Sequence, residues 1–166
     1  MVLKLTRIAD YGVLLMAKVA ASEKPCVAAV ELSGMTHIPA PTVSKILQTL
    51  LAGGVLSSVR GAKGGYSLVG AASDISVADI LLCFDHELAL TACNTDALNC
   101  EQQDNCTISH NWQGINRSIV RVLHHISLSD MMADDFSAEF CLASKPQFSP
   151  PLAVVAEPPC HACTGV

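Results

Sequence analysis

The chain has 166 residues, of which 51% are hydrophobic and only 4% aromatic, and its net charge is −5. This length predicts one compact domain with extensions, or two small units, built around aliphatic side chains. There is no run of the roughly 18 apolar residues that a membrane span needs. The early apolar run, residues 11–17, is flanked by Asp10 and Lys18, which a secretory signal tolerates poorly. We therefore expect a cytoplasmic protein without membrane contact.

The charge distribution and the cysteines indicate which class of protein this is. Residues 1–70 carry seven Lys or Arg and three Asp or Glu, whereas residues 71–166 carry three and twelve. A basic first half before an acidic second half is typical of a DNA-contacting head on a body that faces other protein. The eight cysteines predict metal or redox chemistry rather than disulfides, because cytosolic thiols are kept reduced.

Three helices are predicted in the first half of the chain. Apolar residues three or four apart indicate a helix over residues 6–21, with Thr6 as its cap, and a short one over residues 27–34. After a turn, Pro41 suits the first turn of a third helix, where no amide proton is needed. We expect that helix to end at Gly53-Gly54.

A basic hairpin follows the third helix. Residues 55–60 and 66–69 have the composition of strands, and three glycines lie in the turn between them. This order predicts a winged helix-turn-helix, in which a helix enters the major groove and the hairpin contacts phosphates. The residues expected to contact DNA are Thr42, Ser44, Lys45 and Gln48 of the helix and Arg60, Lys63, Gly64, Gly65 and Tyr66 of the hairpin.

The second half is predicted to hold a short helix over residues 76–83, an irregular segment over residues 84–109 and a long helix from Trp112 to Ile126. The apolar stripe of the long helix exceeds what a small head can cover, so we expect it to pack on a second copy of the chain. That stripe consists of Trp112, Ile115, Ile119, Val122, Leu123 and Ile126. The expected fold class is mainly α with a small β-wing: a winged helix-turn-helix with a long C-terminal dimerisation helix.

These segments predict four parts. Residues 1–83 are expected to form the DNA-binding domain, residues 84–110 a cluster-binding loop, and residues 111–135 the dimerisation helix with a following turn. Residues 136–166 are rich in proline towards the end and lack periodicity, which predicts a disordered tail. Cys160 and Cys163 in that tail have the spacing of metal ligands, but a lone pair there indicates no defined role.

Three cysteines in the irregular segment are the strongest chemical feature. Six residues separate Cys93 from Cys100, five separate Cys100 from Cys106, and His110 follows after three more. Thiolates are soft, charged ligands that suit iron and zinc. Structural zinc sites usually use closer pairs, so the wider spacing favours an iron–sulfur cluster over zinc. For the fourth ligand, His110 is one candidate and Asp10 of a neighbouring subunit is another.

Together these segments resemble the Rrf-two family of winged-helix transcriptional regulators, especially its IscR-like members and the regulators of SUF-type iron–sulfur assembly operons. The resemblance covers residues 1 to about 132, and it is carried by residues 3–11, 39–50 and 55–66 and by the three-cysteine loop. It implies a homodimer on double-stranded DNA, a [2Fe-2S] cluster in many members and [4Fe-4S] in some, and cluster-dependent control of operons. We favour [2Fe-2S].

The resemblance also assigns residues. It places Cys93, Cys100 and Cys106 as cluster ligands, with His110 fourth as in the IscR type or Asp10 as in other members. The IscR type has one residue fewer before that histidine and one fewer between the first two cysteines. It also has a glutamate at the centre of the recognition helix where this chain has Ser44, which leaves the operator sequence open.

Three functions follow from these features. The first is a cluster-containing regulator that represses iron–sulfur assembly genes, with cluster occupancy or redox state as the signal. The second is a DNA-binding repressor that senses nitric oxide or thiol state without a standing cluster. The third, a small iron–sulfur redox enzyme, is disfavoured because the sequence has no nucleotide loop, triad or paired carboxylates. We therefore expect no enzyme and no small-molecule substrate.

Overall fold

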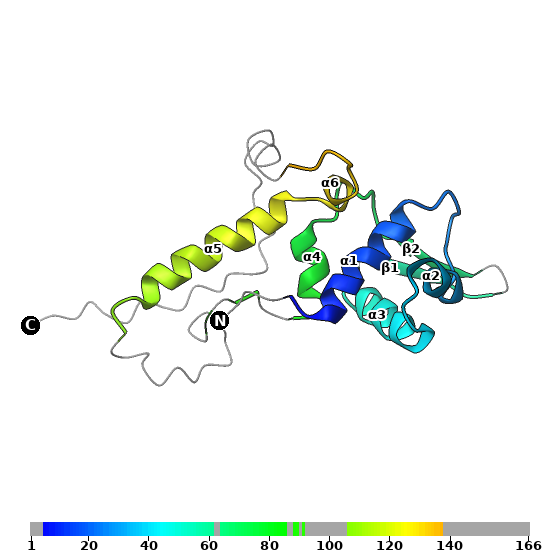
Figure 1. The fold of residues 1–166 in the computed structure, drawn as a ribbon, viewed down its shortest axis with the longest axis horizontal. Helices are drawn as coiled ribbons and strands as arrows, with labels where there is room; N and C mark the ends of the chain where they lie inside the picture. Colours follow the sequence, from blue (N-terminus) through cyan, green and yellow to red (C-terminus); the bar gives the residue numbers. More distant parts are fainter. Residues whose placement is uncertain (1–4, 62–63, 86–87, 90, 92–105, 138–166) are drawn as a thin grey trace, which may run out of the picture.

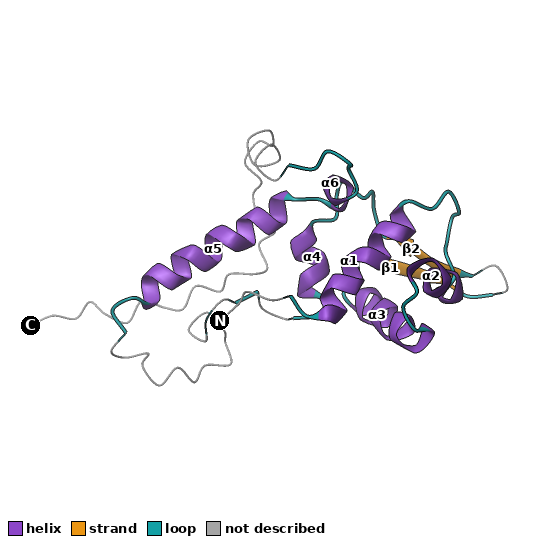
Figure 2. Cartoon of the chain, in the orientation of Figure 1, coloured by secondary structure: helices purple, strands orange, loops and turns teal. Residues whose placement is uncertain are grey.

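A computed structural model describes residues 5–61, 64–85, 88–89, 91 and 106–137. Figure 1 shows a head of helices with a hairpin at one end, and a long helix that extends from the other end. In the described part the helices are α1 (Arg7–Ala20), α2 (Ala29–Thr36), α3 (Ala40–Ala52), α4 (Val77–Leu82), α5 (Ser109–His125) and α6 (Leu128–Met131), and the strands are β1 (Leu56–Val59) and β2 (Gly65–Leu68). The mainly helical fold with a small antiparallel wing confirms the predicted class (Figure 2).

Helix α1 is the centre of the head. It begins where predicted, because the Thr6 hydroxyl accepts a hydrogen bond of 3.2 Å from the amide of Ala9 and so caps the first turn. Its inner face buries Leu15, Met16 and Val19. These side chains belong to the main hydrophobic cluster, to which α3 and the hairpin also contribute. Helix α1 therefore fixes the orientation of the recognition helix.

The segment between α1 and α2 differs from the prediction. Val27, expected to be helical, lies beside the hairpin: its amide donates to the carbonyl of Tyr66 and its carbonyl accepts from the amide of Tyr66, both at 2.9 Å. Val27 is buried and β-branched, which suits a pleated position better than a helix start. Helix α2 begins only at Ala29 and ends at Thr36.

The helix-turn-helix turn depends on one unusual backbone conformation. His37, which follows α2, has φ 58° and lies in the left-handed region. A residue in this region ends a helix sharply and turns the chain. Helix α3 then starts with Pro41 in its first turn, as predicted, and ends at Ala52, before Gly53.

Helices α4 and α6 begin with the same short motif. An isoleucine and a serine are followed, three residues after the serine, by an aspartate, once at Ser76 and Asp79 and again at Ser127 and Asp130. Each serine hydroxyl accepts from the aspartate amide, at 3.1 and 3.2 Å, and each aspartate carboxylate accepts from the serine amide, at 2.9 and 2.8 Å. The two capping boxes therefore start both helices by the same mechanism.

The two motifs lie against each other in an antiparallel bridge. The amide of Val77 donates to the carbonyl of Ile126, and the amide of Leu128 donates to the carbonyl of Ile75, both at 2.8 Å. Ile126 and Val77 also belong to a second hydrophobic cluster with Ala9. This joint attaches the C-terminal end of α5 to the head. No helix of the described residues is both long and apolar enough to cross a bilayer.

Candidate DNA interface and metal site

Helix α3 presents a polar face opposite its buried face. Lys45 and Gln48 are exposed, and Thr42 and Ser44 are half-buried. The helix is held from beneath by four buried aliphatic residues, which are Val43, Ile46, Leu47 and Leu50. This arrangement leaves the short polar side chains available to base edges, as expected for a recognition helix.

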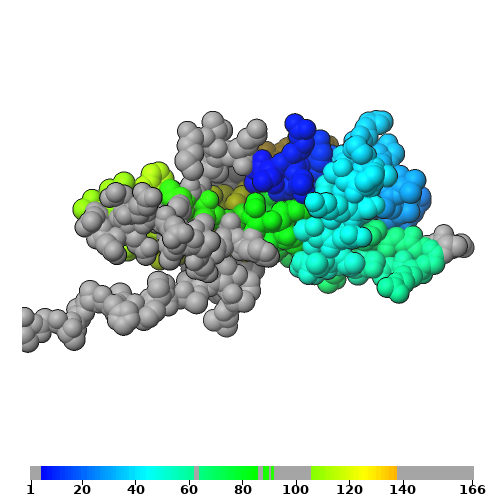
Figure 3. Space-filling model, turned by 90° about the horizontal axis from the view of Figure 1, so that it is seen from below, coloured from blue at the N-terminus to red at the C-terminus, as the bar shows by residue number. Residues whose placement is uncertain are grey.

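The hairpin adjoins this helix, because β1 packs on α3. In Figure 3 the cyan surface of α3 and the green-cyan surface of the hairpin adjoin at one end of the molecule. Arg60 is exposed at the end of β1, where its guanidinium is available to a phosphate. Lys63 lies outside the described residues. An exposed cation beside a polar helix is the arrangement that a winged head uses on a duplex.

Two hairpin glycines are required by the backbone. A Cβ on Gly64 would lie 2.2 Å from the carbonyl oxygen of Val59, and a Cβ on Gly65 would lie 2.6 Å from the carbonyl of Val27. The close approach of Val27 therefore requires glycine at position 65, and a contact with DNA is not needed to explain this glycine. The side chain of Tyr66 is half-buried against the main core, so its role in the fold is also internal.

Two of the candidate metal ligands are near the start of α5. Cys106 is half-buried, and its carbonyl accepts from the Ser109 hydroxyl at 3.2 Å. His110, in the first turn of α5, is exposed. Cys93 and Cys100 lie outside the described residues. Within the described ranges no three His, Cys, Asp or Glu side chains come together.

The donor set itself fits an iron–sulfur cluster. Three thiolates and one imidazole are soft and borderline ligands of the kind that cluster iron takes. Cys106 and His110 stand four residues apart and neither is fully buried, so both are accessible to a group at this end of α5. The other candidate, Asp10, is exposed in the first turn of α1.

Cys83 behaves differently from these cysteines. Its thiol donates to the carbonyl of Asp79 at 3.2 Å and packs so closely on Gly53 that a Cβ there would lie 2.2 Å from Sγ. Burial, and secondarily the negative charge of Asp79, raises the pKa of this thiol. Cys83 is therefore a protonated packing residue at neutral pH.

The residues of the predicted dimer stripe differ in exposure along α5. Trp112 and Ile115 are 37% and 46% exposed. Ile119, Val122 and Leu123 are half-buried. Ile126, predicted as part of the stripe, is instead buried within its own chain at 7% exposure, because the joint with α4 covers it. The part of α5 far from the head therefore leaves apolar surface uncovered.

Comparison with known proteins decides the family. The Rrf2 family model, described as "Iron-dependent Transcriptional regulator", matches residues 5–134. The chain belongs to the Rrf2 family. Among curated Rrf2-type relatives, the HTH-type transcriptional regulator IscR of Vibrio atlanticus is 31% identical over 134 residues, which cover 80% of this chain and 77% of the relative. Protein rrf2 of Nitratidesulfovibrio vulgaris is 27% identical over 150 residues, which cover 89% and 97%.

Solved structures agree with this Rrf2 assignment. T. potens IscR is 26% identical and has a TM-score of 0.61, with 88% of this chain and 94% of that chain covered. CymR, the global cysteine regulator of B. subtilis, is 20% identical with a TM-score of 0.62 and coverage of 79% and 97%, a likeness of fold. The Rrf2 relatives are transcriptional regulators. This chain is accordingly a DNA-binding transcriptional regulator and not an enzyme, as predicted.

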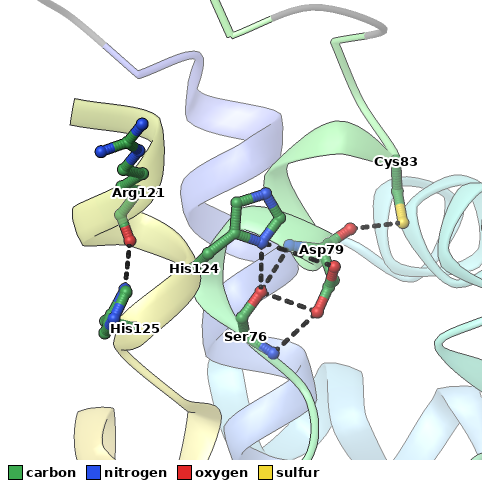
Figure 4. Close-up of polar contacts among 6 residues, drawn as sticks. All are labelled: Ser76, Asp79, Cys83, Arg121, His124 and His125. Atoms are coloured by element: carbon green, nitrogen blue, oxygen red, sulfur yellow. Dashed lines mark hydrogen bonds and ion pairs between the residues drawn. The ribbon is translucent and has the colours of Figure 1, made fainter. Parts of the chain in front are cut away.

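The sequence patterns did not predict one polar cluster of this Rrf2 protein. His124 of α5 lies against Ser76 and Asp79 at the start of α4 (Figure 4). The residues next to His124 in the sequence give no sign of this contact. The repeated serine–aspartate motif was the only hint of this cluster in the sequence. It marks the starts of two helices, but it does not reveal that the two starts lie side by side.

Proposed function

We propose that this Rrf2 protein carries an iron–sulfur cluster on Cys93, Cys100 and Cys106 and that the cluster controls its binding to DNA. One observation carries the proposal: a head from a family described as iron-dependent is followed by three closely spaced cysteines, the last of which directly precedes the long helix α5. In the sequence, the proposed ligands stand between the DNA-reading head and the helix that would meet a second subunit.

His110 is the favoured fourth ligand. It is exposed and stands four residues after Cys106, whereas Asp10 is on α1 and is proposed only as a ligand from a second subunit. Three thiolates with one imidazole favour [2Fe-2S] over [4Fe-4S]. When bound, such a cluster supplies a redox-active group that is more labile than one held by four thiolates. The chain's own residues hold it and connect it to α5.

The DNA duplex is read by α3 and contacted by the hairpin. Lys45 and Gln48 are the exposed polar side chains of α3, with Thr42 and Ser44 beside them. Arg60 and Lys63 at the hairpin neutralise phosphates, and Gly64 keeps the turn tight. Gly65 and Tyr66 remain proposed contacts of the hairpin, and both also have a role within the head.

The active form is a homodimer that binds through α5. Trp112 and Ile115 expose apolar surface on a helix that touches the head mainly through α4, and a second copy of the same helix supplies a matching surface. With occupied clusters the dimer represses iron–sulfur assembly genes, and cluster loss releases them. The alternative function is that of a repressor that senses nitric oxide or thiol state without a permanently bound cluster.

The decisive experiment is to purify the protein without oxygen, record its visible spectrum and count iron and acid-labile sulfide. We expect a coloured protein with about two of each per chain. Cys106→Ala is expected to lose the colour, whereas Cys26→Ser, a cysteine outside the proposed ligand set, keeps it. His110→Ala against Asp10→Ala identifies the fourth ligand. A protein that stays colourless after reconstitution with ferrous iron and sulfide would overturn the proposal and favour the alternative.

A further inference from the structure

His124 occupies a confined position at the joint between α5 and the head. Its side chain is only 12% exposed, although it belongs to a helix with no buried residue. Nδ1 of the ring lies 3.4 Å from the Ser76 hydroxyl and 4.0 Å from Oδ1 of Asp79. Figure 4 shows the ring crossing from α5 to the first turn of α4. It is thus a polar link between the two elements.

The hydrogen bonds around Ser76 determine the role of the ring nitrogen. The Ser76 hydroxyl donates its one proton to Oδ2 of Asp79 at 2.7 Å and accepts from the Asp79 amide at 3.1 Å. A hydroxyl has one donor and two acceptor sites, so one lone pair remains for the ring. Nδ1 of His124 must therefore be the donor in the 3.4 Å contact.

The other charged groups described around the joint do not take the place of Asp79 beside the His124 ring. On α5, Arg121 is exposed, and its carbonyl is hydrogen-bonded to the ring of His125 at 2.8 Å. On α4, Cys83 bonds the Asp79 carbonyl, and on α6 Asp130 is held in the cap of Ser127. The charged side chains of α1 are exposed, and among the described residues no ion pair joins them to the ring; they are Arg7, Asp10 and Lys18.

We propose that His124 is a positioning residue that holds α5 at a fixed angle on the DNA-binding head through Ser76 and Asp79. This role rests on the proposed function, because it requires two heads joined by α5 to meet two half-sites. A loosely held head must be ordered when the dimer binds, which costs affinity. Loss of the His124 contact is therefore expected to lower operator affinity.

The test has one arm without DNA. Holo-protein carrying His124→Gln, Asp79→Asn or both is unfolded by heat, with the wild type alongside. The side-chain oxygen in Asp79→Asn can still accept the bonds from Ser76. We expect the two changes to be coupled by about a two- to fivefold factor in the unfolding equilibrium. Additive effects of the two changes would overturn the proposed link.

The second arm measures binding of each protein to a labelled DNA fragment from upstream of its own gene. At a temperature where every variant is folded, His124→Gln is expected to bind this DNA about two- to fivefold more weakly than the wild type does. His125→Gln is the matched control, because the adjacent ring bonds Arg121 instead, and its affinity should match that of the wild type. Equal affinities of the wild type and His124→Gln would overturn the positioning role. Failure of the wild type to bind would contradict the proposed function itself, whatever the unfolding arm shows.

Discussion

The ring of Phe84 lies directly on Gly12: a Cβ added to Gly12 would be 2.4 Å from Cε2 of the ring. Phe84 packs against both hydrophobic clusters and stands where the chain leaves α4 towards Cys93. The absence of a side chain at Gly12 therefore lets α1 and the beginning of the cysteine loop approach each other.

Gly12→Ala should consequently displace the ring and lower the free energy of unfolding by about 1–3 kcal/mol, the usual cost of overpacking. Urea titration followed by circular dichroism measures this cost. In Gly12→Ala with Phe84→Leu the clash is relieved, so the double variant should lose less than the two single losses added together. Strictly additive losses would show that the two residues do not interact.

Gly65→Ala is expected to separate the hairpin from Val27. The obstacle is backbone, 2.6 Å from the new Cβ, and backbone cannot turn aside as a side chain can. We expect a loss of about 2–3 kcal/mol in stability and weaker DNA binding, because two hydrogen bonds at Val27 are strained and the wing is displaced.

Gly34→Ala is the matched control for that substitution. Gly34 lies inside α2, and nothing is within 4 Å of its Cβ position. Alanine there should stabilise the protein by about 0.5–1 kcal/mol, because glycine is a poor helix former. Equal losses for Gly34→Ala and Gly65→Ala would mean that the close approach to Val27 is unimportant.

His37 is expected to respond to substitution through its backbone. Because its φ is 58° and its side chain is exposed, His37→Gly should stabilise the fold by up to about 1 kcal/mol, whereas His37→Val should destabilise it by about 1–2 kcal/mol. Thermal unfolding of both variants checks the order. If valine were tolerated as well as glycine, the turn would not need its left-handed residue.

The thiol of Cys83 should be slow to alkylate. Burial raises its pKa, so the folded protein holds this proton more tightly than the unfolded chain does. The group therefore contributes stability below the ordinary pKa of a thiol, and that contribution is lost as the pH rises through the raised value. Mass spectrometry after iodoacetamide treatment should find Cys83 modified much faster in urea than in the folded protein at mildly alkaline pH. Equal rates would contradict its burial.

Local signals predicted the elements that local chemistry determines. The Thr6 cap, Pro41 in the first turn of α3 and the glycine-rich hairpin turn were all interpreted correctly from neighbouring residues. The pairing of Val27 with Tyr66, and of Ser76 with Ser127, joins residues far apart in the chain. Periodicity over a few residues carries no information about such partners, so Val27 was assigned to a helix and the joint was missed.

The same distinction applies to the candidate site. The spacing of the cysteines indicates metal chemistry from the sequence, because ligand type and separation are local properties. The stripe on α5 was predicted correctly as amphipathic, but its division into an exposed part at Trp112 and a buried part at Ile126 depends on where α4 packs. That packing is a tertiary property that the stripe alone cannot specify.

The most direct test of the account is the affinity of the cluster-loaded and cluster-free protein for DNA from its own promoter, measured at one fixed salt concentration. With the loaded wild type we expect binding at least about tenfold tighter than with the cluster-free form, and the variant Cys93→Ala/Cys100→Ala/Cys106→Ala should behave as cluster-free throughout. Equal affinity of the loaded wild type, the cluster-free wild type and the triple variant would contradict the claim that the cluster controls the affinity for DNA.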